Sequence, residues 1–207
     1  MNTTNKPAPR GRPRRFDPDE ALVQAQRLFH EKGYDGVSVA DLTQALGIRP
    51  PSFYAAFGSK LELYQRVLER YISNGALLLR QILEAEQSLA VALTQVLEEA
   101  ARSYAVDPGA TGCLVLEGTR SDDPQARAAA DRYHQAAQAL IRARIAACQP
   151  QRAEELADFV ITTMAGLSAS ARHGQSVERL LASARLAGLA LTQALAADGA
   201  RLDGCDL

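Results

Sequence analysis

Residues 38–60, SVADLTQALGIRPPSFYAAFGSK, contain the pattern that decides the fold of this chain. Ser38 and Asp41 form a capping-box-like pair at the start of a helix, and Gly47 suits the turn that ends it. A second short helix is predicted over 50–57, because prolines are tolerated in a first turn, whose N–H groups have no partner within the helix. Two short helices joined by a glycine turn are typical of proteins that lay one helix in a DNA major groove.

Helices are also predicted on both sides of this stretch. One covers about 17–32, and Ser59 with Glu62 opens a longer helix that runs to about residue 87. Phe53 and Phe57 are four residues apart, so both can face the first helix. The residues between them are then free to point outward.

The rest of the chain is predicted to be helical as well. Alanine and leucine dominate, tryptophan is absent, and aromatic residues make up 5% of the chain, which disfavours sheets. Further helices are predicted over about 88–106, 111–120, 124–148, 151–173 and 176–197. We therefore expect an all-α protein of about nine helices.

Charge is unevenly distributed although the net charge is only −1. Residues 1–60 carry nine Lys/Arg and six Asp/Glu, or +3, whereas residues 61–207 carry fourteen and eighteen, or −4. The first fifteen residues hold five basic groups and no acidic one. This segment either binds a polyanion or is a solvated tail, and its charge alone does not separate the two.

Several classes of protein are disfavoured by what the sequence lacks. The three cysteines are far apart and form no CxxC, so neither a disulfide framework nor a zinc site is expected. No apolar run resembles a signal peptide or reaches the length of a membrane span, which favours the cytoplasm. No nucleophile–base constellation or phosphate-binding loop appears, so we expect no enzyme, no cofactor and no metal.

Small residues recur in the last predicted helix. Ala184, Ala187 and Gly188 lie between leucines, and small residues let helices approach closely. The last two helices, about 151–197, therefore form either an intermolecular bundle or an ordinary core within one chain.

The segments LFHEKGYDGVSV (28–39), DLTQALGI (41–48) and PPSFYAAFGSKLELY (50–64) resemble the TetR/AcrR family of bacterial transcriptional regulators. The resemblance covers about 14–71. It implies a flexible basic arm (1–13), a helix-turn-helix DNA-binding domain (14–74, reading motif about 37–57), and a helical ligand-binding and dimerisation domain (75–207). It also implies a homodimer through the last two helices, which binds a near-palindromic double-stranded operator.

The resemblance assigns roles in DNA binding to particular positions. Arg49, Pro51, Ser52 and Ala55 are expected to face bases, and Tyr54, Ser38 and Lys60 to contact phosphates. Basic residues of the arm would track phosphates or enter the minor groove; they are Arg12, Arg14 and Arg15. Ser38 is a helix cap in any case, Tyr54 can instead pack against its neighbours, and Lys60 can simply be solvated.

The start of the reading helix departs from the family pattern. Many relatives have Ser or Thr at position 49 and Lys or Gly among the next two residues, whereas this chain has Arg49-Pro50-Pro51. The prolines lack the backbone N–H groups that could otherwise donate hydrogen bonds to DNA phosphates. An operator preference therefore does not transfer from a typical relative.

In the C-terminal part, the family encloses a ligand whose binding shifts the long helix that begins at Lys60. Cys113, in ATGCLVLEG (110–118), resembles the GCL segment of relatives that sense electrophiles, oxidants or metal, and the plainer alternative is a buried thiol. Four further residues can either line a polar pocket or lie at the surface, and the sequence does not separate these alternatives: Tyr104, Arg120, Tyr133 and His134.

The function that we expect is that of a repressor released by a small-molecule or thiol-reactive inducer. The alternative is an architectural or cell-division factor that uses the same scaffold without a small ligand.

Overall fold

The computed structural model describes residues 17–196, apart from the side chain of Asn74. Arg12, Arg14 and Arg15, predicted to contact DNA, lie outside the described residues. Every regular element in the described range is helical, as predicted. These elements are α1 (Pro18–Lys32), α2 (Val39–Leu46), α3 (Pro50–Phe57), α4 (Lys60–Glu84), α5 (Leu89–Ala105), α6 (Leu114–Gly118), α7 (Pro124–Cys148), the 3₁₀ turn η1 (Pro150–Arg152), α8 (Ala153–Arg172) and α9 (Val177–Ala196).

The first three helices begin and end where their capping residues lie. Ser38 and Asp41 form a full capping box on α2, in which each side chain binds the other residue's backbone N–H. Gly47 follows in the left-handed conformation, with φ of 64°. The Ser59 hydroxyl accepts the Glu62 N–H at 3.1 Å and so starts α4. Local side-chain chemistry therefore fixes the boundaries of this part of the chain.

Aromatic residues form the centre of this N-terminal head, which comprises α1–α3 and the start of α4. Phe29, Phe53, Phe57 and Tyr64 are all fully buried. Phe29 meets Tyr64 edge-on with ring centroids 5.1 Å apart, and Phe53 lies 5.6 Å from Phe57. The predicted inward orientation of both α3 phenylalanines is confirmed.

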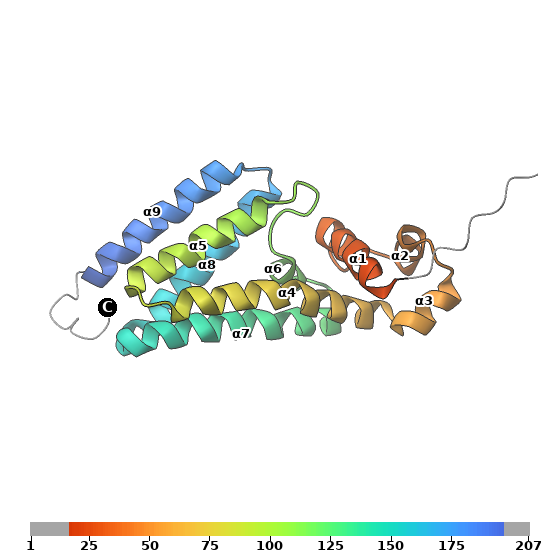
Figure 1. Cartoon of the computed structure of the whole chain (residues 1–207), viewed down its shortest axis with the longest axis horizontal. Coiled ribbons are helices and arrows are strands. Elements are labelled where there is room, and N and C mark those ends of the chain that lie inside the picture. The colour runs from red at the N-terminus through yellow and green to blue at the C-terminus, as the bar shows by residue number, and fades with distance from the viewer. Residues whose placement is uncertain (1–16, 197–207) are drawn as a thin grey trace, which may run out of the picture.

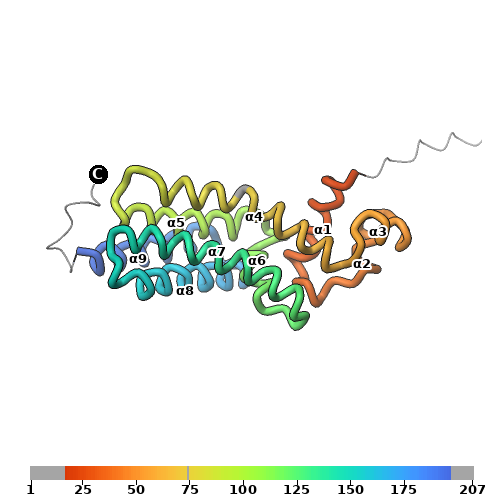
Figure 2. The backbone as a smooth tube through the Cα atoms, turned by 90° about the horizontal axis from the view of Figure 1, so that it is seen from below, coloured from red at the N-terminus to blue at the C-terminus, as the bar shows by residue number. Residues whose placement is uncertain are grey.

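The long helix α4 joins this head to the rest of the molecule. Figure 1 shows α1, α2 and α3 grouped at one end, while α4 runs beside α7 toward the other end, and Figure 2 shows the same arrangement from below. The apolar core of the head continues into the next helices, because Leu114 and Val115 of α6 and Ala126 of α7 belong to it. The predicted domain limit at residue 74 thus falls inside a continuous helix.

The remaining core is formed mainly by α5, α7, α8 and α9, with a contribution from the end of α4. Ala184 is fully buried there, and a Cβ atom on Gly188 would lie 2.6 Å from the Thr94 side chain of α5. The small residues of α9 therefore allow close packing on α5 of the same chain, which is the intramolecular one of the two alternatives. None of the described helices is long and apolar enough to cross a membrane.

Candidate nucleic-acid interface and ligand cavity

The residues predicted to read DNA share one exposed face of α3. Phe53 and Phe57 anchor the opposite face in the core, and Tyr54 is 53% exposed. The four positions predicted to face bases, Arg49, Pro51, Ser52 and Ala55, are all exposed, as is Tyr54, a predicted phosphate contact. Since α3 lies at the end of the molecule away from the bundle, nothing in the described part covers this face (Figure 1).

The N-terminus of α3 is unusually poor in capping groups. Arg49 occupies the N-cap position without a side-chain hydrogen bond to the helix, and Pro50 and Pro51 carry no N–H. Ser52 supplies the first backbone donor of the helix. The guanidinium of Arg49 is thus the main positive group at this end, and it is exposed to solvent.

Ser38 and Lys60, the other two predicted phosphate contacts in the head, have roles in the fold. Ser38 is engaged in the capping box of α2. The Lys60 ammonium donates to the carbonyl oxygens of Tyr34 at 3.1 Å and Val37 at 2.9 Å, and lies 3.9 Å from the centre of the Tyr34 ring. Lys60 therefore ties the start of α4 to the loop between α1 and α2, and its contact with phosphate stays a prediction.

Replacing Lys60 by methionine should destabilise the protein. The change leaves two carbonyls without their charged donor, and such a hydrogen bond contributes about 1.5–3 kcal/mol. Chemical denaturation should show a loss of that size. Lys32→Met is the matched control, since Lys32 is exposed and its loss should cost less than about 0.5 kcal/mol. Equal losses of unfolding free energy in the two variants would contradict a structural role for Lys60.

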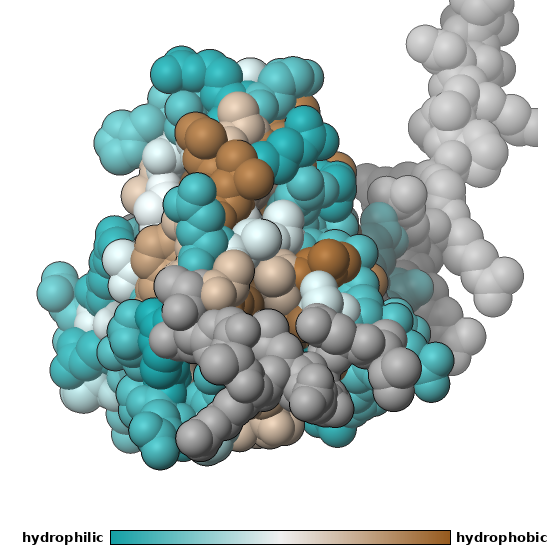
Figure 3. Space-filling model, turned by 90° about the vertical axis from the view of Figure 1, so that its left-hand side faces the viewer, coloured by the Kyte–Doolittle hydropathy of each residue, from teal (hydrophilic) through white to brown (hydrophobic). Residues whose placement is uncertain are grey.

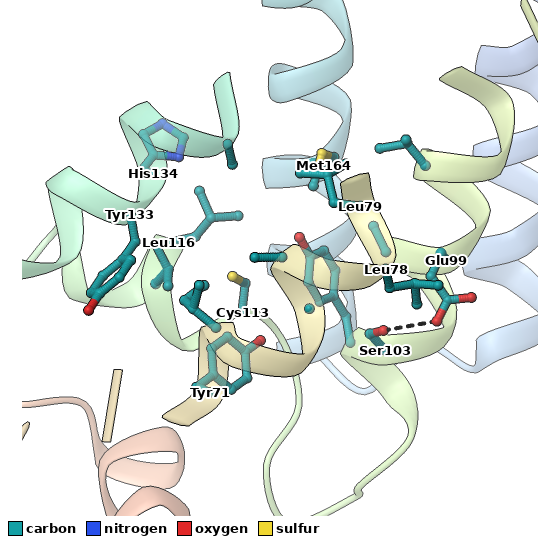
Figure 4. A pocket seen from close by; sticks show the side chains of 18 of the residues that line it. Tyr71, Leu78, Leu79, Glu99, Ser103, Cys113, Leu116, Tyr133, His134 and Met164 are labelled. Carbon is teal, nitrogen blue, oxygen red and sulfur yellow. Dashed lines mark hydrogen bonds between the residues drawn. The ribbon is translucent and has the colours of Figure 1, made fainter. Parts of the chain in front are cut away.

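A cavity of about 410 Å³ lies between the C-terminal helices. Its walls come from α4, α5, α6, α7 and α8, and most are aliphatic (Figure 4). The polar groups that line it are Tyr71, Glu99, Ser103, Tyr104, Cys113, Tyr133 and His134. Such a site suits a mainly apolar small molecule oriented by a few polar groups.

Cys113 lines this cavity beside two tyrosines. It is partly buried at the N-cap of α6, and its backbone N–H donates to the Ser168 hydroxyl at 2.9 Å. Figure 4 shows Tyr71 on α4 next to Cys113. Burial, and then the neighbouring Cys113, raise the pKa of both Tyr71 and Tyr104. Both phenols therefore stay neutral and can donate a hydrogen bond.

The sequence identified part of this cavity. Tyr104, Tyr133 and His134 line it, which is one of the two alternatives left open for them, and Cys113 lines it as well. Arg120 does not line it; it is exposed in the turn after α6, which is the surface position left open for it. Tyr71 also lines the cavity but was not among the predicted site residues, because sequence spacing does not show an empty space beside a helix. No group of residues suited to a metal ion occurs within residues 17–196.

One histidine of the head touches the segment that precedes Cys113. His30, near the end of α1, is 5% exposed, and its Nε2 lies 3.0 Å from the Gly112 carbonyl. The carbonyl can only accept, so Nε2 carries the proton. Burial lowers the pKa of His30 below its ordinary value of 6.5, and nearby Arg172 lowers it further.

The stability of the protein should therefore fall in weakly acidic solution. A lowered pKa means that the unfolded chain takes up the His30 proton at a higher pH than the folded chain. The stabilisation is complete above pH 6.5 and is lost as pH falls from there toward the folded pKa. The slope should reach at most about 1.4 kcal/mol per pH unit for one proton. Denaturation at several pH values should show this slope, and His30→Gln should remove it, whereas an unchanged slope would assign it to other groups.

Comparison with known proteins agrees with this geometry. Residues 21–67 match the family model for bacterial regulatory proteins of the tetR family. The chain is 51% identical over 181 residues to the Escherichia coli K12 transcriptional repressor BdcR, covering 87% of this chain and 92% of BdcR. It is 32% identical over 185 residues to the repressor ComR of the same organism, covering 83% and 87% of the two chains.

A solved structure supports the same relationship. A cysteine mutant of the TetR family regulator CifR, complexed with 26-bp double-strand operator DNA, superimposes with a TM-score of 0.78 at 35% identity. The match covers 87% of this chain and 99% of the CifR chain. Likeness thus extends through both the head and the bundle.

Proposed function

Because this chain belongs to the TetR family of bacterial transcriptional regulators, we propose that it is a cytoplasmic repressor that binds an operator as a homodimer and is released by an inducer. The exposed face of α3 carries the proposal. Two phenylalanines fix that helix from behind, so its outer residues form a rigid reading surface. Operator binding by the relative CifR, seen in a complex with double-strand DNA, supports the same role here.

The outer faces of α8 and α9 are the proposed dimer interface. Phe159 on α8 is 39% exposed, and Leu186 and Leu189 on α9 are 67% and 62% exposed. Apolar residues come to the surface in the upper part of Figure 3, at the height at which α9 runs in Figure 1. The small residues of α9 pack against α5 of the same chain. The larger exposed residues of α8 and α9 are therefore available to contact a second copy of the chain. A two-fold interface would bury each of them twice.

The cavity supports the inducible form of this function. A ligand that fits the cavity better in a spread dimer than in the DNA-bound one would release the operator. Cys113 and its two neutral tyrosines are among the few polar groups of the cavity, and they suit a mainly apolar, thiol-reactive molecule. A factor that organises DNA without a ligand has no evident use for such a cavity.

Selection of bound fragments from the organism's own DNA tests the proposal. A few promoter fragments with near-palindromic sites would support a repressor. Sites dispersed over the chromosome would instead favour the architectural or cell-division alternative. The genes next to the selected fragment would also narrow the chemical class of the inducer.

Cys113→Ser tests the sensing thiol. N-ethylmaleimide forms a bond from the cysteine sulfur to one carbon of its double bond, and the proton ends on the other carbon. Treated wild type should lose at least tenfold in affinity for the selected fragment, since a coupling of about 1–3 kcal/mol is typical. The serine variant should keep its affinity, measured by fluorescence anisotropy with mass spectrometry to locate the adduct. Release that persists in the variant would exclude Cys113.

A further inference from the structure

Two contacts hold the head of this protein to the segments on either side of α6. Before α6, His30 donates to the Gly112 carbonyl. After α6, Asp35 in the head accepts from the Ser121 hydroxyl and from the Asp122 N–H, both at 2.9 Å. The head is therefore joined to the bundle by more than the continuous helix α4.

Only the first of these contacts adjoins the cavity. Gly112 immediately precedes Cys113, and its own N–H donates to the Tyr104 carbonyl at 2.8 Å. His30 also packs edge-on against Tyr71, with ring centroids 5.7 Å apart, and Tyr71 lines the cavity. A change in the cavity beside Cys113 and Tyr71 can therefore reach His30 through the Gly112 carbonyl and through the Tyr71 ring.

The segment at Gly112 is tightly seated. Its φ is +84°, and a Cβ atom would lie 2.9 Å from the Arg172 side chain and 3.1 Å from that of Ser168, both on α8. Arg172 in turn donates to the His30 carbonyl at 3.1 Å. Because little free space surrounds this junction, a shift of Gly112 must be followed by its neighbours or must break their hydrogen bonds.

We propose that His30 is a positioning residue, through which the arrangement of the Gly112–Cys113 segment sets the position of the DNA-binding head. In the DNA-competent form, the imidazole holds α1 against this segment. An inducer bound beside Cys113 displaces Gly112, and α1 follows or is released. This route runs through α1 and adds to any movement of α4. It rests on the proposed function, because it assumes that the cavity receives the inducer.

Reciprocity makes the route measurable without an inducer. If the seated segment favours DNA binding, then DNA binding must favour the seated segment by the same factor. The N–H groups of Gly112 and Cys113 are both hydrogen-bonded in this arrangement, so their exchange with solvent reports on it. The selected promoter fragment should slow exchange in the 107–113 segment by roughly fivefold or more.

The decisive experiment compares hydrogen exchange in four full-length proteins, with and without the selected fragment. Wild type and His30→Gln, which keeps an N–H donor, should both show the slowing. His30→Leu, which keeps apolar volume but has no donor, should bind the fragment more weakly and lose the slowing. Asp35→Asn is the control for general loosening, because it weakens the contact on the far side of α6 and should keep the slowing.

The outcomes separate this inference from the proposed function. Slowing that persists in His30→Leu, or that is absent in wild type, overturns the role of His30. If His30→Leu does not fold, wild type and His30→Gln still test the inference. DNA should slow hydrogen exchange of the 107–113 segment in both proteins, and unchanged exchange in either one contradicts the inference. Failure of N-ethylmaleimide to release wild type from DNA is a different result, which counts against the sensing thiol and not against the link to the head.

Discussion

Arg49→Ala should remove most sequence-specific DNA binding while leaving the fold intact. Arg49 is exposed at the start of α3 and makes no capping hydrogen bond to that helix, so the fold does not depend on its side chain. A guanidinium that binds a guanine edge contributes about 1–3 kcal/mol of discrimination. Two copies in a dimer would contribute about 2–6 kcal/mol, which is roughly a 30-fold to 10⁴-fold loss of affinity.

Fluorescence anisotropy with the selected fragment and a shuffled fragment measures this effect. Arg49→Ala should weaken binding to the selected fragment far more than binding to the shuffled one. Tyr54→Phe should weaken both alike, because a hydroxyl on phosphate carries no sequence information. Arg80→Ala, which removes the same charge from an exposed position on the distant half of α4, should change little. A similar loss for both arginine variants would reduce the role of Arg49 to net charge.

The double variant Leu186→Glu/Leu189→Glu should convert the dimer into monomers. Both leucines are largely exposed in the single chain, so the substitutions cost the monomer little. In a two-fold interface each leucine occurs twice, and burying one contributes about 1.5–3 kcal/mol. The change also brings carboxylates together in the interface, so the dimer dissociation constant should rise by more than roughly 10⁴-fold.

Sedimentation velocity should show this loss of the dimer directly. Affinity for a near-palindromic fragment should fall with it, because one head then binds without the other. Leu77→Glu is the matched control, since Leu77 is 59% exposed on α4, away from α8 and α9. An unchanged dimer in the double variant would move the interface to another surface.

Much of the head could be predicted because its determinants are local. The capping pair Ser38–Asp41 and the turn at Gly47 act within a few residues, and the structure places α2 and α3 at the predicted boundaries. The spacing of Phe53 and Phe57 also fixed which face of α3 is exposed. The exposed face of α3 follows from the sequence, since a helix with two anchored phenylalanines has one free side.

The long-range contacts were not predictable in the same way. Lys60 resembled a solvated or phosphate-binding lysine, yet it binds carbonyls 26 and 23 residues earlier in the chain. For Arg120 the sequence left a pocket and a surface position equally open, and only the turn after the short helix α6 places it at the surface. Tyr71 was not predicted to line the cavity, because the spacing of residues along a helix does not reveal an empty space beside that helix.

The sequence by itself determined the helices and the exposed face of α3, since periodicity and capping operate between neighbouring residues, and its motifs carried the resemblance to the family. Only the tertiary structure showed which helix the small residues of α9 pack against and which groups line the cavity. It also revealed the contact between His30 and Gly112, residues 82 positions apart. Such contacts depend on how whole helices pack, and packing depends on the summed shapes of side chains that are distant in the chain.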